Sequence, residues 1–263
     1  MLTVHKTNIG GAGVTNKVSI LQLTTLAALG LAAAQANALC TFGGSGEPSL
    51  QGSFDSMLGA NTLSATTSCL NDGDDAAWTT VGSVGQIDIV LELAGNASTN
   101  SFGVYDLNNP NARLSIFDGA DTVGDQAVLR LRQTVNGWRV SVQQVGSSTW
   151  THQIISTSAF GFYLSAQGEG TFYSQSSRNA DGVDHLYAYR GTGTPFLTGP
   201  LAGEFFSRED YILAWEDLRG GGDRDYQDFV AVVQDIKPVP LPPAVLLMIS
   251  GLVGLAGVSR RTA

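Results

Sequence analysis

The sequence predicts an all-β fold, a single jelly-roll-like β-sandwich, because short segments alternate apolar and polar residues at strand spacing. Glycine accounts for 32 of the 263 residues, and no stretch of the body shows a helical period. Nine or ten strands at short spacing are typical of a sandwich. The chain divides into a leader at residues 1–38, the sandwich at 39–237 and a C-terminal segment at 238–263.

The leader has the features of a secretory signal peptide. Lys6 and Lys17 precede an apolar run at residues 18–34, and Ala36-Asn37-Ala38 supplies the small residues that signal peptidase requires. We therefore expect cleavage after Ala38. A lipidated Cys40 is the less favoured alternative, because Leu39 stands where lipidation needs a small residue.

Cys40 and Cys69 are the two cysteines of the chain, and both fall near the start of the exported body. An even count in an oxidising compartment predicts a disulfide, which would close a loop of about 30 residues. Two free thiols are the alternative.

The strand candidates follow in chain order. A hairpin is predicted at residues 127–145, because Asn136-Gly137 separates two alternating segments and both residues tolerate positive φ. The other predicted strands are residues 86–94, 102–106, 113–117, 160–164, 185–190, 211–216 and 229–236. Residues 43–59 and 191–203 are loop-like but are not linkers between domains.

Charge is distributed unevenly. All 23 acidic residues lie between Glu47 and Asp235, against 9 arginines and no lysine in the same region, a balance of −14. Such an acidic body disfavours nucleic acid and anionic membrane surfaces as partners and favours divalent cations.

The densest acidic stretch is residues 214–230, which precedes the C-terminal segment. It places five carboxylates around a triple glycine: Glu216, Asp217, Asp223, Asp225 and Asp228. Carboxylates this close repel one another unless a cation or arginines neutralise them. Oxygen ligands on a flexible loop suit Ca²⁺, so we expect a calcium site here.

One alternative to this site remains open. Arg219 and Arg224 would pair with neighbouring aspartates if the segment were a solvated acidic hairpin. The spacing does not fit an EF-hand. Weaker cation candidates at residues 71–75 and 118–125 are more simply turns, since Asp, Asn and Gly dominate turns.

The same stretch carries a family resemblance. Trp215-Glu216-Asp217-Leu218, the glycines and Asp223-Arg224-Asp225-Tyr226-Gln227-Asp228 look like the closing motif of an uncharacterised β domain of secreted bacterial proteins. Residues 102–106 (FGVYD), residues 161–164 (GFYL) and Asp184-His185 recur in that family in the same order. The resemblance spans residues 102–233 and implies the fold and export, since its members have no established activity.

The C-terminal segment resembles a PEP-CTERM sorting signal of Gram-negative bacteria that make exopolysaccharide. Val239-Pro240-Leu241-Pro242 stands where the family has Pro-Glu-Pro, an apolar transmembrane segment at 241–258 follows, and Arg260-Arg261 close it. The resemblance implies a precursor anchored in the inner membrane, exosortase as a partner and delivery to the cell surface or outside the cell. An anchor that is never cleaved is the alternative.

No catalytic residue is predicted. The body holds His152 and His185 but no nucleophile elbow, zincin helix or phosphate loop. His185 fits a strand-end residue bonded to backbone. The sequence thus favours a non-enzymatic, calcium-stabilised protein of the extracellular matrix or cell surface. The alternatives are a carbohydrate-binding module, with Trp150 as its exposed platform, and a secreted glycan-active enzyme.

Overall fold

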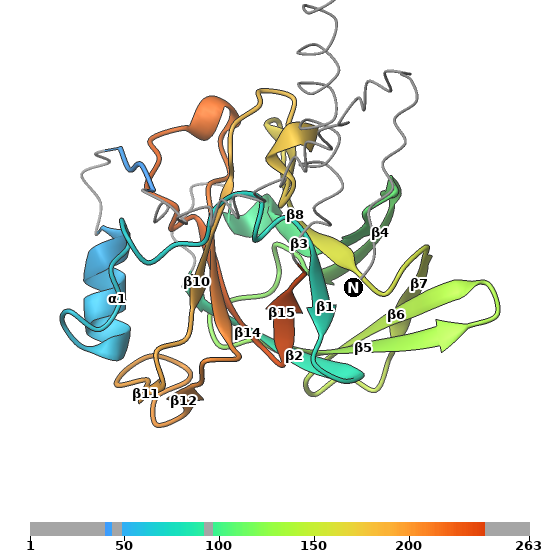
Figure 1. Ribbon diagram of the computed structural model, residues 1–263, viewed down its shortest axis with the longest axis horizontal. Coiled ribbons are helices and arrows are strands. Elements are labelled where there is room, and N and C mark those ends of the chain that lie inside the picture. The colour runs from blue at the N-terminus through green and yellow to red at the C-terminus, as the bar shows by residue number, and fades with distance from the viewer. Residues whose placement is uncertain (1–39, 44–48, 92–96, 240–263) are drawn as a thin grey trace, which may run out of the picture. The chain divides into compact units, whose positions relative to one another are not determined.

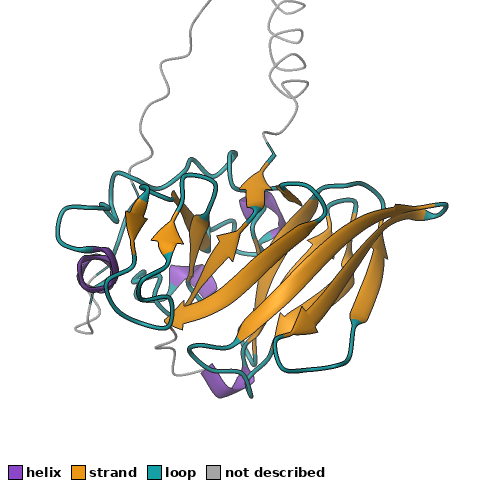
Figure 2. Cartoon of the chain, turned by 90° about the horizontal axis from the view of Figure 1, so that it is seen from below, coloured by secondary structure: helices purple, strands orange, loops and turns teal. Residues whose placement is uncertain are grey.

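The computed structural model describes residues 40–43, 49–91 and 97–239. The predicted signal peptide, the transmembrane segment at 241–258 and the sorting residues Pro240, Pro242, Arg260 and Arg261 lie outside these ranges. Within them, no helix combines the length and the apolar character needed to cross a membrane. Strands make up most of the regular structure and the helices are short, which confirms the prediction of a mostly β fold (Figure 2).

The larger sheet has seven antiparallel strands in the order β10-β13-β14-β2-β5-β6-β7 (Figure 1). Their bounds are β10 (Leu186–Arg190), β13 (Tyr211–Trp215), β14 (Phe229–Gln234), β2 (Val84–Leu91), β5 (Gln126–Thr134), β6 (Gly137–Gln144) and β7 (Thr151–Ile155). β5, β6 and β7 follow one another through a hairpin and a short loop, whereas β2 pairs with β14 and β5, which are distant from it in sequence. Along each strand, the alternation of side chains sets which of them face the core.

The second sheet runs β15-β1-β8-β3-β4, with β9 paired to β8. Its strands are β15 (Ile236–Pro238), β1 (Trp78–Thr80), β8 (Phe160–Ala166), β3 (Ser101–Asp106), β4 (Asn109–Phe117) and β9 (Gly170–Tyr173). Pro238 pairs with Trp78, and the N–H of Val239 donates to the carbonyl of Ala77 at 2.8 Å. The first two residues of the predicted sorting segment therefore adjoin this sheet.

The remaining elements are short. They are the helix α1 (Leu50–Leu58), the 3₁₀ turns η1 (Ala97–Thr99), η2 (Ser176–Arg178) and η3 (Arg219–Gly221), and a small ribbon of β11 (Thr194–Pro195) with β12 (Phe205–Phe206).

The main core lies between the two sheets. Side chains from both sheets meet in one buried cluster, with Phe102 and Phe162 stacked at 5.4 Å and Phe229 stacked on Phe102 at 4.8 Å. Trp215 of β13 is fully buried in this cluster. Trp138 is partly buried and packs against the same cluster.

A second core covers the outer face of β10, β13 and β14. α1 buries Leu50, Phe54, Met57 and Leu58 against residues that include Tyr189 and Val232. The prediction of a loop at residues 43–59 is therefore wrong. The apolar residues recur at helical spacing, and the Ser49 hydroxyl caps the helix by accepting from the N–H of Gly52 at 3.1 Å.

The FGVYD and GFYL motifs have a packing explanation. β3 and β8 are antiparallel, so Gly103 lies opposite Tyr163 and Tyr105 lies opposite Gly161. A Cβ at Gly161 would lie 2.2 Å from the ring of Tyr105, and one at Gly103 would lie 2.9 Å from the ring of Tyr163. Each glycine thus leaves room for the tyrosine of the opposite strand.

The predicted hairpin is present, but its turn lies one residue earlier. Thr134 pairs with Gly137, so the loop is Val135-Asn136. Gly137, at φ 124°, already belongs to β6. A Cβ there would lie 2.6 Å from the carbonyl oxygen of Ile155, so this glycine permits the close approach of β7.

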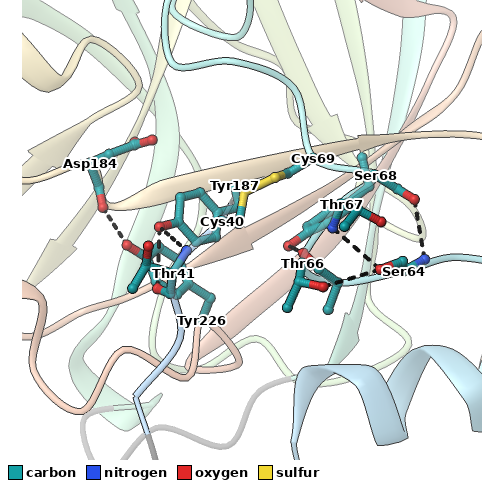
Figure 3. The surroundings of a disulfide bond; sticks show 12 residues. Cys40, Thr41, Ser64, Thr66, Thr67, Ser68, Cys69, Asp184, Tyr187 and Tyr226 are labelled. Atoms are coloured by element: carbon teal, nitrogen blue, oxygen red, sulfur yellow. Dashed lines mark hydrogen bonds between the residues drawn. A yellow bond between two sulfur atoms is a disulfide. The ribbon is translucent and has the colours of Figure 1, made fainter. Parts of the chain in front are cut away.

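The predicted disulfide joins Cys40 and Cys69 (Figure 3). Cys69 bridges to Tyr189 of β10, and the N–H of Cys40 donates to the carbonyl of Thr66 at 3.1 Å. The N–H of Thr41 donates to the hydroxyl of Tyr187 at 3.2 Å, and the Tyr187 ring stacks on that of Tyr226 at 3.8 Å. The disulfide therefore holds the segment at residues 40–43 against the outer face of the larger sheet.

Replacing both cysteines, as in Cys40→Ser/Cys69→Ser, should lower the free energy of unfolding by about 3–4 kcal/mol, the loop-entropy value for a loop of this length. Denaturant unfolding of the oxidised wild type, the reduced wild type and the variant measures this difference. The reduced wild type should match the variant. Equal stability of oxidised and reduced wild type would contradict the prediction.

Candidate metal centre

The acidic loop connects two paired strands of the larger sheet. Trp215 at the end of β13 pairs with Phe229 at the start of β14, so Glu216 and Asp228 are neighbours across the strand ends. The N–H of Asp217 donates to Oδ2 of Asp228 at 2.9 Å. Two central strands therefore fix both ends of the loop.

The structure brings all five predicted carboxylates together. Glu216, Asp223 and Asp225 form one group, and Glu216, Asp217 and Asp228 form a second. In each group, one carboxylate oxygen from every residue lies within 4.8 Å of the others. Glu216 belongs to both groups and is therefore the centre of the cluster.

Glu216 is buried without a full set of partners. Its side chain is 0% exposed. Oε1 accepts a hydrogen bond from the N–H of Leu218 at 3.2 Å, whereas Oε2 has no hydrogen-bond partner among the described residues. A buried carboxylate oxygen without a donor is costly unless it is protonated or bound by a cation.

The pKa values of the cluster show that ionising these buried carboxyls is costly. Burial, together with the neighbouring carboxylates of Asp228 and Asp223, raises the pKa of Glu216 to about 9. Burial, with the Asp217 carboxylate beside it, raises the pKa of Asp228 to about 7. At neutral pH the cluster therefore requires either bound protons or positive charge.

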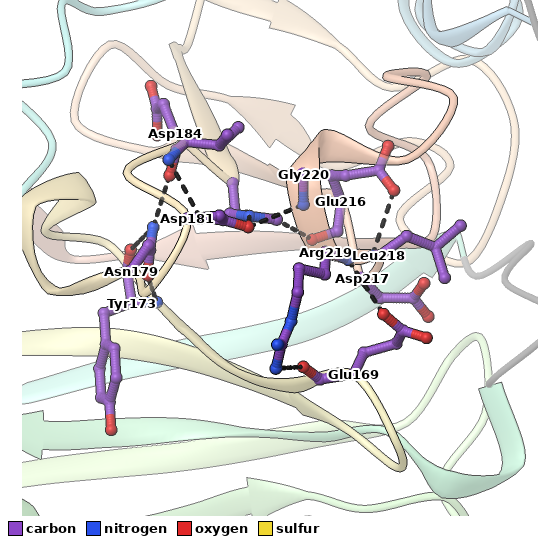
Figure 4. Close-up of polar contacts among 12 residues, drawn as sticks. Glu169, Tyr173, Asn179, Asp181, Asp184, Glu216, Asp217, Leu218, Arg219 and Gly220 are labelled. Carbon is purple, nitrogen blue, oxygen red and sulfur yellow. Dashed lines mark hydrogen bonds and ion pairs between the residues drawn. The ribbon is translucent and has the colours of Figure 1, made fainter.

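The arginines of the loop do not supply that charge. The Arg219 guanidinium donates to the backbone carbonyl of Glu169 at 2.8 Å (Figure 4). Across residues 40–43, 49–91 and 97–239, the single ion pair is His185 with Asp181. The arginine-paired hairpin that the sequence left open thus has no Arg–Asp pair in this loop.

The backbone of the loop is strained in the way that tight ligand loops are. Arg224 and Tyr226 have φ of 59° and 56°, in the left-handed region that non-glycine residues avoid. Gly222 adopts φ 44°. A Cβ on Gly222 would lie 2.4 Å from Oε1 of Glu216, so glycine at this position lets the Glu216 carboxylate approach the loop.

Two buried amides hold the aspartates from outside. Nδ2 of Asn100 donates to Oδ2 of Asp217 at 2.9 Å, and Nε2 of Gln227 donates to Oδ2 of Asp225 at 2.9 Å. The sequence analysis missed both residues. Asn100 is 117 positions from its partner, so only the tertiary structure could reveal it, whereas Gln227 lies inside the acidic motif itself.

His185 supports the centre through the backbone, as predicted. Its Nδ1 lies 2.9 Å from the carbonyl oxygen of Glu216, and its Nε2 lies 3.1 Å from Oδ2 of Asp181. Both partners are oxygen atoms of the fold, so both ring nitrogens of His185 are engaged. Asp181 also accepts from the N–H of Gly220 at 2.8 Å (Figure 4). Burial acts to raise the pKa of Asp181. The hydrogen bonds from the N–H groups of Gly220 and Val183 and the contact with His185 outweigh burial and lower this pKa to about 2.

The disulfide-linked segment also reaches the acidic loop. The N–H of Gly43 donates to the carbonyl of Arg224 at 3.0 Å, and a Cβ on Gly43 would lie 1.8 Å from the carbonyl oxygen of Asp223. The start of the described body therefore packs directly on the loop, so the disulfide and the acidic cluster belong to one structural unit.

The weaker acidic loops are turns. Oδ2 of Asp121 accepts from the N–H of Asp118 at 2.8 Å, and Oδ2 of Asp125 accepts from the N–H of Thr122 at 2.7 Å. In the other loop, Nδ2 of Asn71 donates to Oδ2 of Asp74 at 2.9 Å. The carboxylates of Asp74, Asp121 and Asp125 are thus engaged within their own turns. Asp75 differs, because it is buried and neither of its carboxylate oxygens has a hydrogen-bond partner among the described residues.

One comparison with known proteins gives a match. Residues 134–235 match a family model described as a domain of unknown function (DUF4114). The match begins at the β5–β6 turn and includes the whole acidic loop and β14. The comparisons with curated proteins and with solved structures find no match.

Gly222→Ala should lower the free energy of unfolding by about 2–3 kcal/mol, because the new methyl group must displace the Glu216 carboxylate or the loop. Thermal or denaturant unfolding measures this. Gly220→Ala is the matched control: it has φ 76° in the same loop, with nothing within 4 Å of its Cβ position, so it should cost about 1 kcal/mol. Equal losses in the two variants would show that Gly222 makes no room for Glu216.

Proposed function

We propose that this protein is an exported, non-enzymatic β-sandwich protein of the cell surface or extracellular matrix, stabilised by calcium held by Glu216, Asp217, Asp223, Asp225 and Asp228. The observation that carries the proposal is the Glu216 carboxylate. This carboxylate is fully buried and belongs to both groups of carboxylates. Its Oε2 has no hydrogen-bond donor among the described residues.

Calcium fits the donor set better than other common metals. The five side chains offer only carboxylate oxygens, which are hard ligands, and no sulfur or imidazole nitrogen lies within the two groups. Calcium accepts six to eight oxygens in flexible geometry, whereas Mg²⁺ requires a near-ideal octahedron and keeps several waters. Mg²⁺ is usually bound through only one or two carboxylates, so five carboxylates on one irregular loop favour the larger ion.

Bound calcium would join the end of β13, the glycine loop and the start of β14. It would also stabilise the ionised form of Glu216, removing the cost of keeping this carboxyl protonated. A ligand present at 100 times its Kd stabilises the folded state by about 2.7 kcal/mol. The ion would thus act mainly on stability.

Export is supported by the disulfide and by the acidic, lysine-free composition of the body. Disulfides persist in oxidising compartments outside the cytoplasm. The signal peptide at residues 1–38 and the PEP-CTERM resemblance at 238–263 complete the proposed route through the inner membrane, with exosortase as the processing partner.

The burial of Glu216 favours a structural function over catalysis. A catalytic acid or base must contact substrate, whereas Glu216 is 0% exposed. His185 is equally buried, and both its ring nitrogens are engaged within the fold. We therefore favour the structural function over the alternative of a secreted glycan-active enzyme.

Removing calcium should lower the melting temperature of the full-length chain, and adding it back should restore the value. Glu216→Gln should abolish this response, because it removes the central charge while keeping the shape of the side chain. Glu209→Gln, at an exposed turn residue, is the matched control and should respond like the wild type. An unchanged melting temperature of the wild type in chelator would contradict the calcium site.

The route makes a separate prediction about the mature protein. In cells that carry exosortase, intact mass should show a chain that begins after Ala38 and lacks Arg260 and Arg261. Pro240→Ala/Pro242→Ala should leave more of the precursor uncut. A mature mass that still includes Arg261 would contradict exosortase processing and leave the calcium proposal untouched.

A further inference from the structure

The outer face of the seven-stranded sheet is divided into two halves. α1, with described residues from 40–43 and 59–70, covers it over β10, β13 and β14 and builds the second core there. Figure 1 shows α1 beside β10, while β5, β6 and β7 lie at the other end of the sheet. On those three strands the outward positions are exposed or partly exposed.

The uncovered half is basic in an otherwise acidic protein. Arg130, Arg132 and Arg139 are exposed, and His152 lies opposite Ser141 on the same face. The sequence has no Asp or Glu between residues 126 and 168. These strands therefore carry three positive charges and no negative one, in a body whose overall balance is −14.

The arginines of this face have no carboxylate partner among the described residues. Arg132 lies directly opposite Arg139 in the β5–β6 ladder. Like charges at directly opposed positions destabilise a sheet, so folding alone does not explain the pair. A local conflict of this kind is expected where a surface has been shaped for a ligand.

An aromatic ring adjoins the charges. The guanidinium carbon of Arg130 lies 4.2 Å from the centroid of the Trp150 ring. This cation–π contact restrains Arg130 and leaves Trp150 partly exposed. A pocket of about 350 Å³ lies beside Arg130 and Arg132 and is lined also by Ser83, Val84 and Leu131.

We propose that the outer face of β5, β6 and β7, with Arg130, Arg132, Arg139 and Trp150, binds a carboxylate-bearing polysaccharide. This proposal rests on the proposed function, because a protein outside the cell would meet such polysaccharides. Arginine binds carboxylates in a bidentate fashion, and the Trp150 ring offers an apolar surface beside the charges.

The charge balance selects this ligand over nucleic acid. Duplex DNA carries one phosphate charge per about 1.7 Å of its axis, and a body of −14 repels such a polymer everywhere outside this small face. A polysaccharide with single carboxylates places fewer charges near the acidic parts of the protein. Charge complementarity would also allow the acidic surface of a second copy of this chain to bind the basic face, and this is the rival to the polysaccharide.

The test is binding of the full-length chain to oligogalacturonate, with its methyl ester as the uncharged probe, by calorimetry at low and moderate salt. The wild type should bind oligogalacturonate, bind the ester at least about tenfold more weakly, and lose affinity as salt rises. Arg132→Gln/Arg139→Gln should weaken binding by about tenfold or more. Trp150→Ala should weaken binding of the charged probe as well.

Arg208→Gln is the matched control. Arg208 is exposed, and its carbonyl accepts from Arg190 of β10, the edge strand opposite β7, so this change should not affect binding. The Arg132/Arg139 variant removes a repulsive pair, so it should be at least as stable as the wild type. With its stability confirmed by thermal unfolding, a loss of binding cannot reflect unfolding. No binding by the wild type, or equal losses in all variants, would overturn the proposal. Self-association that depends on Arg132 and Arg139, without binding of the charged probe, would overturn it in favour of a second copy.

Repeating the titration in chelator and with Glu216→Gln separates this proposal from the calcium site. The arginine face lies on β5, β6 and β7, whereas the acidic loop joins β13 to β14. Binding that persists in chelator and in Glu216→Gln supports the arginine face whatever the outcome for calcium. Binding that disappears in chelator would show that the polysaccharide is held through calcium and would overturn the proposal.

Discussion

The burial of the Glu216 carboxylate is the constraint on which the acidic loop depends. A fully buried acid with no donor on Oε2 among the described residues must hold a proton or a cation. Its neighbours add negative charge to the same point, and the Arg219 guanidinium donates to the carbonyl of Glu169 instead. The left-handed residues, the glycines and the buried amides of the loop are the means by which the chain brings these carboxylates together.

The surrounding fold keeps this arrangement in place. β13 and β14 are adjacent interior strands of the larger sheet and hold both ends of the loop. His185 bonds the carbonyl of Glu216, and Gly43 packs on the carbonyl of Asp223. The disulfide anchors the segment that carries Gly43. The disulfide and the candidate metal centre are therefore linked through the segment at residues 40–43.

Much of this could be predicted from local sequence, and the failures have physical reasons. The strands, the hairpin and the five carboxylates follow from alternation and from acidic density, which are local properties. The contact of Asn100 with Asp217 depends on how distant strands pack. The helix at Leu50–Leu58 lies in a segment rich in Gly and Ser, and it is stabilised by the sheet face that it covers. The opposition of Arg132 and Arg139 depends on the register of the hairpin, and the sequence predicted its turn one residue too late.

The most direct test of the central claim is anomalous X-ray scattering from crystals of the full-length chain grown with calcium. The account predicts a peak about 2.3–2.6 Å from carboxylate oxygens of Glu216 and of at least two of its acidic neighbours. A well-ordered loop with Glu216 buried as in this structure and no peak in the cluster would contradict it, because the carboxyl would then be held by a proton alone.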